Sequence, residues 1–373
     1  MSLKNAKPTF NRIAIKVGSN VITNADGSLD TARMLRIVED ISILCKQGIE
    51  TILITSGAVA AGRNEVTPSK KTNIVEAKQM WAAIGQIKLM SNYQFLFGKY
   101  DIQVGQVLAS KESFSGRSHY LNMKNCMAAM LDNKVIPIVN ENDTVSVNEL
   151  MFTDNDELSG LISSMMDCNS LIILSNVDGI FTGVPGEEGA ELITKIDDTT
   201  EDVGKYISEN KSEFGRGGMS SKSSIAKKTA SQGIDVFIAN GLRDAVITDI
   251  VRNKKIPCTH FVANRKKESG VKKWIAHSGA FARGAVTINA GAREALNGKS
   301  SSLLMVGITK IHGHFKKGDI VSILAEDGTR IGLGKSHYDS KKAELYIGEK
   351  MTKPFIHYHF LVLDEKNGVL PPS

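Results

Sequence analysis

Histidine is scarce in most of this chain, and its scarcity narrows the chemistry that the chain can perform. Only His119 precedes His260. A Ser/His/Asp triad, or a metal site built on histidine, would need more than one such residue in the larger part of the chain. The sequence therefore argues against both classes of site before residue 260.

Cysteines and long apolar runs are lacking as well. The four cysteines are far apart and form no CxxC pair, so neither a zinc knuckle nor a disulfide framework is indicated. No stretch approaches the roughly 20 apolar residues of a membrane span, and the polar N-terminus has no signal-peptide core. We expect a cytoplasmic protein with reduced thiols and no membrane segment.

Histidines recur in the last part of the chain without the partners of a metal site. His312 with His314, and His357 with His359, have the spacing of one strand face. No carboxylate or cysteine pattern accompanies them, so surface histidines are favoured over metal ligands. We expect no metal held by protein side chains.

Three common phosphate-binding signatures are also missing. The chain contains no GxxxxGK[ST] loop, no GxGxxG fingerprint and no HRD and DFG pair. Any phosphate chemistry in this protein must therefore use another scaffold.

Length and charge indicate two domains of different character. A chain of 373 residues with 42% hydrophobic and 23% charged residues fits a globular protein with one large domain and one small domain. The net charge is +6, and the part after residue 264 holds 18 Lys and Arg against 10 Asp and Glu. Basic patches can bind nucleic acid, although scattered lysines are more often ordinary surface.

Residues 1–264 alternate between short apolar runs and helical patterns. The expected strands cover 12–17, 51–55, 104–108, 135–139, 171–174, 236–239 and about 259–262. The expected helices cover 30–46, 74–97, 120–131, 221–232 and 245–252. Such alternation predicts an α/β fold, a three-layer α/β/α sandwich with a mostly parallel sheet.

The pattern changes after a polar, charged stretch at 265–273, which we interpret as a linker. Residues 274–373 contain strand-like runs divided by glycines, namely AVTINAG, SLLMVGI, GDIVSIL, RIGLGKS and AELYIG. Only Gly291 to Leu296 has a helical pattern. These features predict a small, mostly β domain that resembles a barrel.

Polar residues cluster where one buried strand ends. The run VIPIV at 135–139 is followed by NEND, and then by TDND at the start of a helical pattern, which brings in Asp143, Asn155 and Asp156. Open α/β sheets bind ligands outside the carboxyl ends of their strands. Each of the three residues alone could equally be a turn or cap residue.

Two other predicted strands also end in candidate site residues. Lys16 closes the first strand, and a buried lysine costs several kcal/mol unless an anion accompanies it. The alternative is a lysine that extends to water from the strand end. Ser56 and Gly57 end the next strand and begin a helix, whose free N–H groups favour an anion.

The segment GRGGMSSK at 215–222 is the strongest single candidate for a phosphate site. Its glycines would let the backbone approach a ligand closely, a helix begins there, and Lys222 lies one turn in. A plain flexible loop is the alternative.

Two lysines, this loop and an acidic pair together favour phosphoryl transfer, which depends on positioning and charge neutralisation. A carboxylate acceptor would need no general base.

Five sequence blocks stand out along the chain, namely KVGSN at 16–20, ITSGAVAAGR at 54–63, VNEND at 139–143, TDNDELS at 153–159 and GGMSSK at 217–222. Together they resemble the glutamate 5-kinase family of the amino acid kinase superfamily. The C-terminal part resembles the PUA domain that many members of the family carry. The resemblance implies an amino acid kinase domain over 1–264 and a PUA-like domain over 274–373.

The resemblance also implies a reaction. ATP and L-glutamate would give ADP and L-glutamyl 5-phosphate, the first committed step of proline synthesis, with Mg²⁺ bound mainly through the nucleotide phosphates. Lys16 and Lys222 match the lysines that neutralise the transferring phosphoryl group, and Asp156 matches the aspartate that orients them. The matches to the glutamate-binding positions are Ser56, Gly57, Asp143 and Asn155. An α-ammonium needs a carboxylate such as Asp143, and an α-carboxylate needs amide donors.

The nucleotide side matches the family less completely. The matching positions are Ser175, Asn176, Arg216, Gly217, Gly218, Met219, Ser220, Ser221 and Lys222. Asn176 stands where the family usually has Asp, and Arg216 stands where Thr is common. Both departures concern contacts to ATP and leave the phosphoryl-transfer residues unchanged.

Regulation and partners follow from the resemblance alone. It implies proline as a feedback inhibitor and a homo-oligomer, either a dimer or a tetramer. A separate hypothesis is RNA binding by the basic C-terminal domain, in which Trp274, Phe281 and Phe315 would stack on bases. Trp274 and Phe315 fit core positions equally well.

Overall fold

The computed structural model describes residues 10–115, 117–145, 155–197, 218–264, 272, 274–275, 282–297 and 301–364. The chain forms two compact units, one of residues 1–111 and 122–267 and the other of residues 112–121 and 268–373. The domain limits at 264 and 274 stay a prediction. In the described part of the chain, no helix has the length and apolar character needed to cross a membrane.

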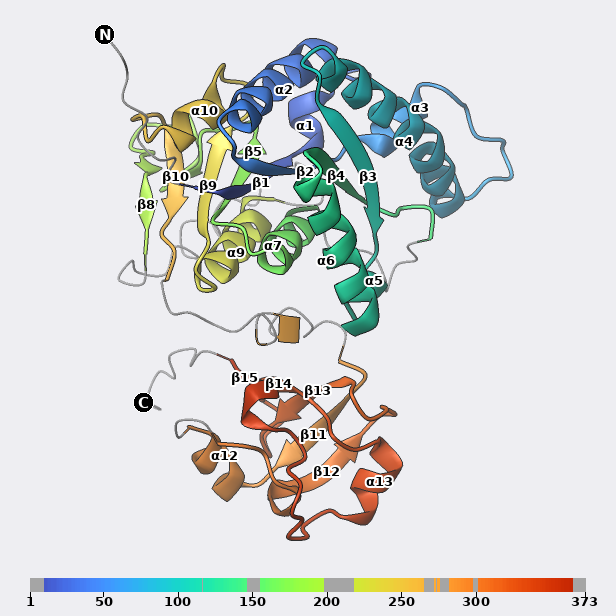
Figure 1. Cartoon of the computed structure of the whole chain (residues 1–373), viewed down its shortest axis with the longest axis vertical. Coiled ribbons are helices and arrows are strands. Elements are labelled where there is room, and N and C mark those ends of the chain that lie inside the picture. Colours follow the sequence, from blue (N-terminus) through green and yellow to red (C-terminus); the bar gives the residue numbers. More distant parts are fainter. Residues whose placement is uncertain are drawn as a thin grey trace. The chain divides into compact units, whose positions relative to one another are not determined.

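An eight-stranded sheet forms the centre of the first unit (Figure 1). Its strand order is β3-β4-β2-β1-β5-β9-β10-β8. The strands are β1 (Arg12–Val17), β2 (Glu50–Ile54), β3 (Gln103–Ala109), β4 (Val135–Glu141), β5 (Ser170–Ser175), β8 (Lys195–Ile196), β9 (Asp235–Asn240) and β10 (Cys258–Phe261). All neighbouring pairs are parallel except β9 and β10. This arrangement confirms the predicted mostly parallel sheet.

Helices cover both faces of this sheet, as Figure 1 shows. One layer contains α1 (Ser19–Ile22), α2 (Thr31–Lys46), α3 (Ala58–Arg63), α4 (Ile74–Gly98) and α10 (Val246–Val251). The other contains α6 (Arg117–Asp132), α7 (Asn155–Met165) and α9 (Met219–Ala230). The α/β/α sandwich expected from the sequence is therefore present.

Alternation along β1 determines which side chains face which helical layer. Ile13, Ile15 and Val17 belong to the buried cluster that also contains residues of α2, α4 and α10. Successive side chains of a strand point to opposite faces, so Ala14 and Lys16 face the layer of α7 and α9. The first strand thus presents one buried lysine, 4% exposed, on the side of those two helices.

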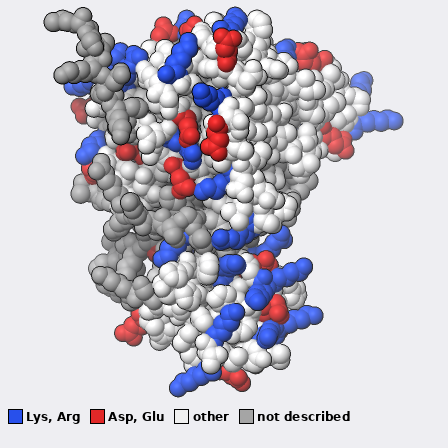
Figure 2. Space-filling view, in the orientation of Figure 1, with Lys and Arg blue, Asp and Glu red and all other residues white. Residues whose placement is uncertain are grey.

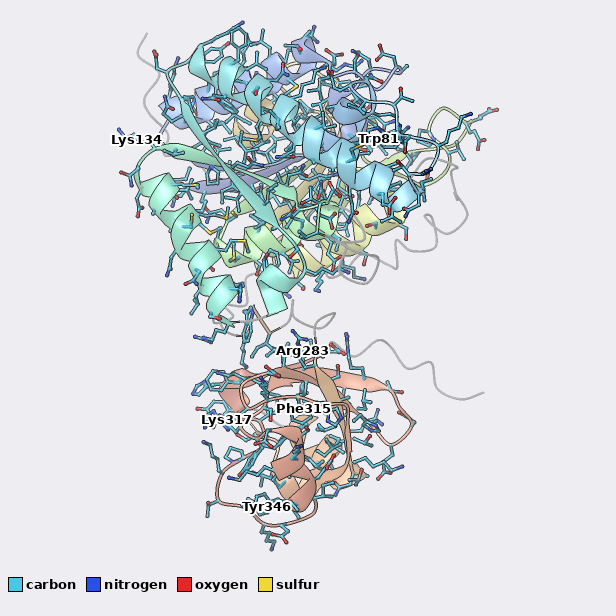
Figure 3. All side chains as sticks on the ribbon, turned by 90° about the vertical axis from the view of Figure 1, so that its right-hand side faces the viewer. Trp81, Lys134, Arg283, Phe315, Lys317 and Tyr346 are labelled. Carbon is cyan, nitrogen blue, oxygen red and sulfur yellow. The ribbon has the colours of Figure 1, made fainter. Side chains whose placement is uncertain are left out.

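Two glycines let α3 and α4 approach each other without intervening side chains. A Cβ atom on Gly62 would lie 1.9 Å from the Trp81 carbonyl oxygen, and one on Gly85 would lie 1.8 Å from that of Ala58. Trp81 itself lies on α4 (Figure 3) and contacts the Arg63 guanidinium at 4.9 Å from its ring centroid. Helix α3 begins at Ala58, directly after Ser56 and Gly57.

The second unit contains a five-stranded sheet in the order β12-β11-β13-β14-β15. Its strands are β11 (Gly284–Ile288), β12 (Ile308–His312), β13 (Ile320–Leu324), β14 (Arg330–Lys335) and β15 (Leu361–Leu363). The expected helix is α12 (Ala290–Asn297). The predicted mostly β character is confirmed.

The prediction of a strand was wrong for two of the strand-like runs in this unit. The run AELYIG begins within α13 (Ser340–Leu345), because the Asp339 side chain accepts a hydrogen bond from the Lys342 N–H and caps a helix there. The run SLLMVGI forms a single bridge at Leu303 and the 3-10 helix η2 (Met305–Gly307). Apolar alternation over so few residues does not separate a strand from a capped helical turn.

The aromatic residues of the RNA-binding hypothesis are buried where they are described. Trp274 is 3% exposed and its Nε1–H donates to the Phe114 carbonyl at 3.1 Å. Phe315 is 4% exposed and lies inside the second unit (Figure 3), edge to face with Phe355. Phe281 lies outside the described residues. Lys and Arg are prominent on the face of this unit seen in Figure 2, but the two described aromatic rings are core side chains.

Candidate active site

One carboxylate joins two lysines that are far apart in the sequence. Lys16 lies near the carboxyl end of β1, Asp156 in the first turn of α7 and Lys222 in the first turn of α9. The Lys16 Nζ lies 2.7 Å from Asp156 Oδ1, and the Lys222 Nζ lies 3.0 Å from Asp156 Oδ2. The structure therefore brings together the three residues to which the sequence assigned phosphoryl transfer.

Burial makes this cluster electrostatically unusual. The side chains of Lys16, Asp156 and Lys222 are 5%, 0% and 12% exposed. Burial opposes ionisation of Asp156, but the charges and hydrogen bonds of the two lysines outweigh it and hold its pKa below the usual value. A buried ion pair is weak evidence for stability, because desolvation offsets the attraction. Two ammonium groups against one carboxylate leave a positive charge that an anion would balance.

The turn after β2 brings a hydroxyl next to the amide of Asn155. Gly57 has φ +98°, a left-handed conformation that favours glycine, and it precedes the first residue of α3. The Asn155 Nδ2 donates to the Thr55 carbonyl at 2.9 Å and to the Ser56 Oγ at 2.8 Å. Ser56 and Asn155, which the sequence placed in one substrate site, are therefore in contact.

Asp143 follows β4 and is partly buried. Burial raises the pKa of its carboxyl group from 3.8 to about 6. No described lysine, arginine or histidine forms an ion pair with it. Such a carboxylate gains most from a cation that arrives with a ligand, and this fits the expected contact with an ammonium group.

The residues expected on the nucleotide side lie at the next strand along the sheet. Ser175 ends β5, which pairs with β1, and its hydroxyl lies 3.4 Å from the Oδ1 of the exposed Asn176. Gly218 precedes α9, and Met219, Ser220 and Ser221 form the start of that helix. Arg216 and Gly217 lie outside the described residues. The free N–H groups at the start of α9 suit an anionic ligand beside Lys222.

Two residues of the site were missed by sequence reasoning. The Asn155 Nδ2 also lies 3.1 Å from the Asn140 Oδ1, and the Asn140 Nδ2 donates to the Gln86 Oε1 at 2.8 Å. Asn140 stands in the NEND segment, which was noted as a whole. Gln86 lies in the middle of α4, and nothing in the local pattern distinguishes it from a surface glutamine.

Comparison with known proteins shows which families the chain is similar to. Residues 11–240 match the amino acid kinase family, and residues 284–357 match the PUA domain. A glutamate 5-kinase of Bacteroides thetaiotaomicron is 51% identical over 360 residues, covering 96% of this chain and 100% of the relative. One from Chlorobaculum tepidum is 46% identical over 363 residues, covering 97% and 99%.

Proposed function

The chain belongs to the amino acid kinase family, and we propose that it is a glutamate 5-kinase, the activity for which its relatives are named. It transfers the terminal phosphoryl group of ATP to the side-chain carboxylate of L-glutamate. The products are ADP and L-glutamyl 5-phosphate, in the first step of proline biosynthesis. The observation that carries this proposal is the buried cluster of Lys16, Asp156 and Lys222.

The cluster supplies charge neutralisation. Phosphoryl transfer has a loose transition state, so the protein contributes mainly position and electrostatic stabilisation. The ammonium groups of Lys16 and Lys222 would face the phosphoryl oxygens while Asp156 keeps both in place. The attacking glutamate carboxylate is already ionised at neutral pH, so no residue has to remove a proton from it.

The substrate amino acid would lie between the ends of β2 and β4. Asp143 would pair with the α-ammonium group, and the Ser56 hydroxyl would donate to a carboxylate oxygen. The Ser56 Oγ already accepts a hydrogen bond from Asn155, so its own O–H is available to a ligand. Gly57, at the same turn, directly precedes α3 and would contact the substrate through its backbone.

ATP would occupy the side of Ser175, Asn176 and the 216–222 segment. Mg²⁺ would be held mainly by the nucleotide phosphates, because Asp156, the central carboxylate, is already paired with two lysines. When bound, Mg²⁺ would neutralise phosphate charge in addition to the lysines. Inhibition by proline and assembly into a dimer or tetramer stay predictions from the family resemblance.

An acceptor panel tests the proposal. We expect ATP and L-glutamate to give an acyl phosphate that hydroxylamine traps as a hydroxamate, with equimolar ADP. N-acetylglutamate, carbamate and UMP should give at most a few per cent of that rate of ADP formation. Turnover with one of these three acceptors but not with glutamate would contradict the proposal.

The raised pKa of Asp143 predicts a pH dependence. Below pH 6 its carboxyl group becomes neutral and no longer pairs with the ammonium group. The kcat/KM for glutamate should therefore fall about tenfold per pH unit below pH 6, as for a single titrating group. Initial rates at limiting glutamate and saturating ATP between pH 5 and pH 8 measure this.

The Asp143→Asn variant provides the control for this titration. It should raise the KM for glutamate at pH 8 and remove the fall between pH 6 and pH 5. Since burial raises the folded-state pKa, the carboxyl contributes stability at low pH that is lost as the pH rises through 6. The variant should thus unfold at a higher temperature than the native chain at pH 8. An unchanged pH profile in the variant would assign the titration to another group.

A further inference from the structure

Helix α4 carries a row of polar side chains that all bond to the segments forming the amino acid site. Gln79, Gln86 and Tyr93 are each seven residues apart, so they lie on one face of the helix. The Gln79 Nε2 donates to the Thr144 carbonyl at 3.2 Å, next to Asp143. The Tyr93 hydroxyl lies 2.9 Å from the Thr55 Oγ1, next to Ser56.

Gln86, in the middle of the row, connects to a chain of amides with a fixed direction. The Asn140 Oδ1 accepts from the Glu141 backbone N–H at 2.9 Å, so the amide nitrogen of Asn140 must face the Gln86 Oε1. At the other end, the Asn155 Nδ2 donates to the Thr55 carbonyl. Backbone groups therefore show which end of the Asn140 and Asn155 amides is nitrogen and which is oxygen, and Gln86 accepts from the Asn140 Nδ2.

This direction leaves the Asn155 Oδ1 available as an acceptor. Neither that atom nor the Gln86 Nε2 has a hydrogen-bond partner among the described residues, although both are buried. A buried polar atom without a partner lowers stability, because its lost hydration is not replaced by a hydrogen bond. At position 86 the Gln86 Oε1 serves the Asn140 Nδ2, whereas the Gln86 Nε2 gains no hydrogen bond from the described residues. A glutamine at position 86 fits a role in holding the Asn140 amide of the site.

We propose that Gln86 is a positioning residue for the amino acid substrate, acting through Asn140 on Asn155 and Ser56. The inference rests on the proposed function. Gln86 holds the Asn140 amide, and the Asn140 Oδ1, 3.1 Å from the Asn155 Nδ2, shares the two hydrogens of that nitrogen with the Thr55 carbonyl and the Ser56 Oγ. Asn140 thereby helps to hold the Asn155 amide with its Oδ1 toward the ligand. Gln79 and Tyr93 fix the flanking segments. The row makes α4 the support for the amino acid side of the site.

The substitution Gln86→Met tests the proposal, because it keeps the approximate volume and removes the acceptor for Asn140. We expect the KM for glutamate to rise at least about tenfold, with kcat and the KM for ATP within about threefold of the native values. Glutamate binding by titration calorimetry, without ATP, should weaken by a similar factor. The unfolding temperature should change little, because the unpartnered Gln86 Nε2 is removed while the buried Asn140 Nδ2 loses its acceptor.

Gln94 provides a matched control on the same helix. It is exposed, so Gln94→Met should leave all these quantities unchanged. A glutamate KM in Gln86→Met within twofold of the control would overturn the proposal. A parallel loss of ATP affinity and of thermal stability would also overturn it, because it would indicate a purely structural role.

A double-mutant cycle tests the route through the amides. In an Asn155→Ala background, Gln86→Met should change glutamate affinity less than twofold, because the group that it positions is gone. Full additivity of the two effects on glutamate affinity would refute the route.

Turnover of glutamate by the native protein is measured first. Its absence would reject the proposed function itself, whereas native turnover with no effect at Gln86 would reject only the positioning role.

Discussion

Replacing Asp156 by asparagine should lower kcat by about a thousandfold, the loss seen when one preorganised electrostatic element of an active site is removed. Asparagine has the shape of aspartate but no charge. Lys16 and Lys222, 5% and 12% exposed, would then repel each other without a shared counter-ion. Their ammonium groups would separate, and the transferring phosphoryl group would meet neither in its proper place. Steady-state kinetics at saturating ATP and glutamate measure the effect.

The matched control for this variant is an ion pair on the surface. Asp244 pairs with Arg36 at 2.6 Å, and the Asp244 side chain is 75% exposed. Asp244→Asn should leave kcat unchanged, since exposed pairs contribute little. Circular dichroism should show that Asp156→Asn remains folded at the assay temperature. A folded Asp156→Asn variant with kcat within tenfold of native would remove the central role of the cluster.

Replacing Gly85 by alanine should destabilise the first unit by more than about 3 kcal/mol, above the usual range for overpacking. The added Cβ would lie 1.8 Å from the Ala58 carbonyl oxygen and 2.5 Å from the Gly62 backbone nitrogen. Both neighbours are backbone atoms, so no side chain can rotate away. Helices α3 and α4 would have to separate, which would displace the Ser56–Gly57 turn and the neighbouring Gln86. Thermal unfolding and the glutamate KM should both change strongly.

Gly98, at the end of the same helix, provides the opposite expectation. A Cβ there would meet no atom within 4 Å. Gly98→Ala should therefore be neutral or stabilise the protein by about 0.5–1 kcal/mol, through helix propensity alone. Similar unfolding temperatures for the two alanine variants would contradict the close contact between α3 and α4.

The sequence predicted the cluster because parallel strands impose an order on their ends. Lys16 ends one apolar run, Asp156 begins a helix after another, and Lys222 begins a third element after the glycine-rich segment. Once alternating strands and helices are recognised, these positions all fall at one edge of the sheet. The structure was needed to obtain the distances and to show that both lysines share one carboxylate.

Sequence reasoning could not identify the supporting residues. Gln86 and Tyr93 lie in a helix whose pattern is mostly apolar, and their partners Asn140 and Thr55 are more than thirty residues away. A polar residue inside a helical pattern carries no local sign of whether it faces water or a buried amide. Likewise, Gly62 and Gly85 were not recognised as a helix contact, because the close approach depends on tertiary packing.

The position of β1 in the sheet has a consequence for synthesis on the ribosome. This strand pairs with β2 on one side and with β5, more than 150 residues later, on the other. Until β5 leaves the exit tunnel, a nascent chain presents an apolar strand with one unsatisfied edge. Such edges promote aggregation and engagement by chaperones. The centre of this sheet should therefore complete its pairing only after β5, which ends at Ser175 of the 373 residues, has left the ribosome.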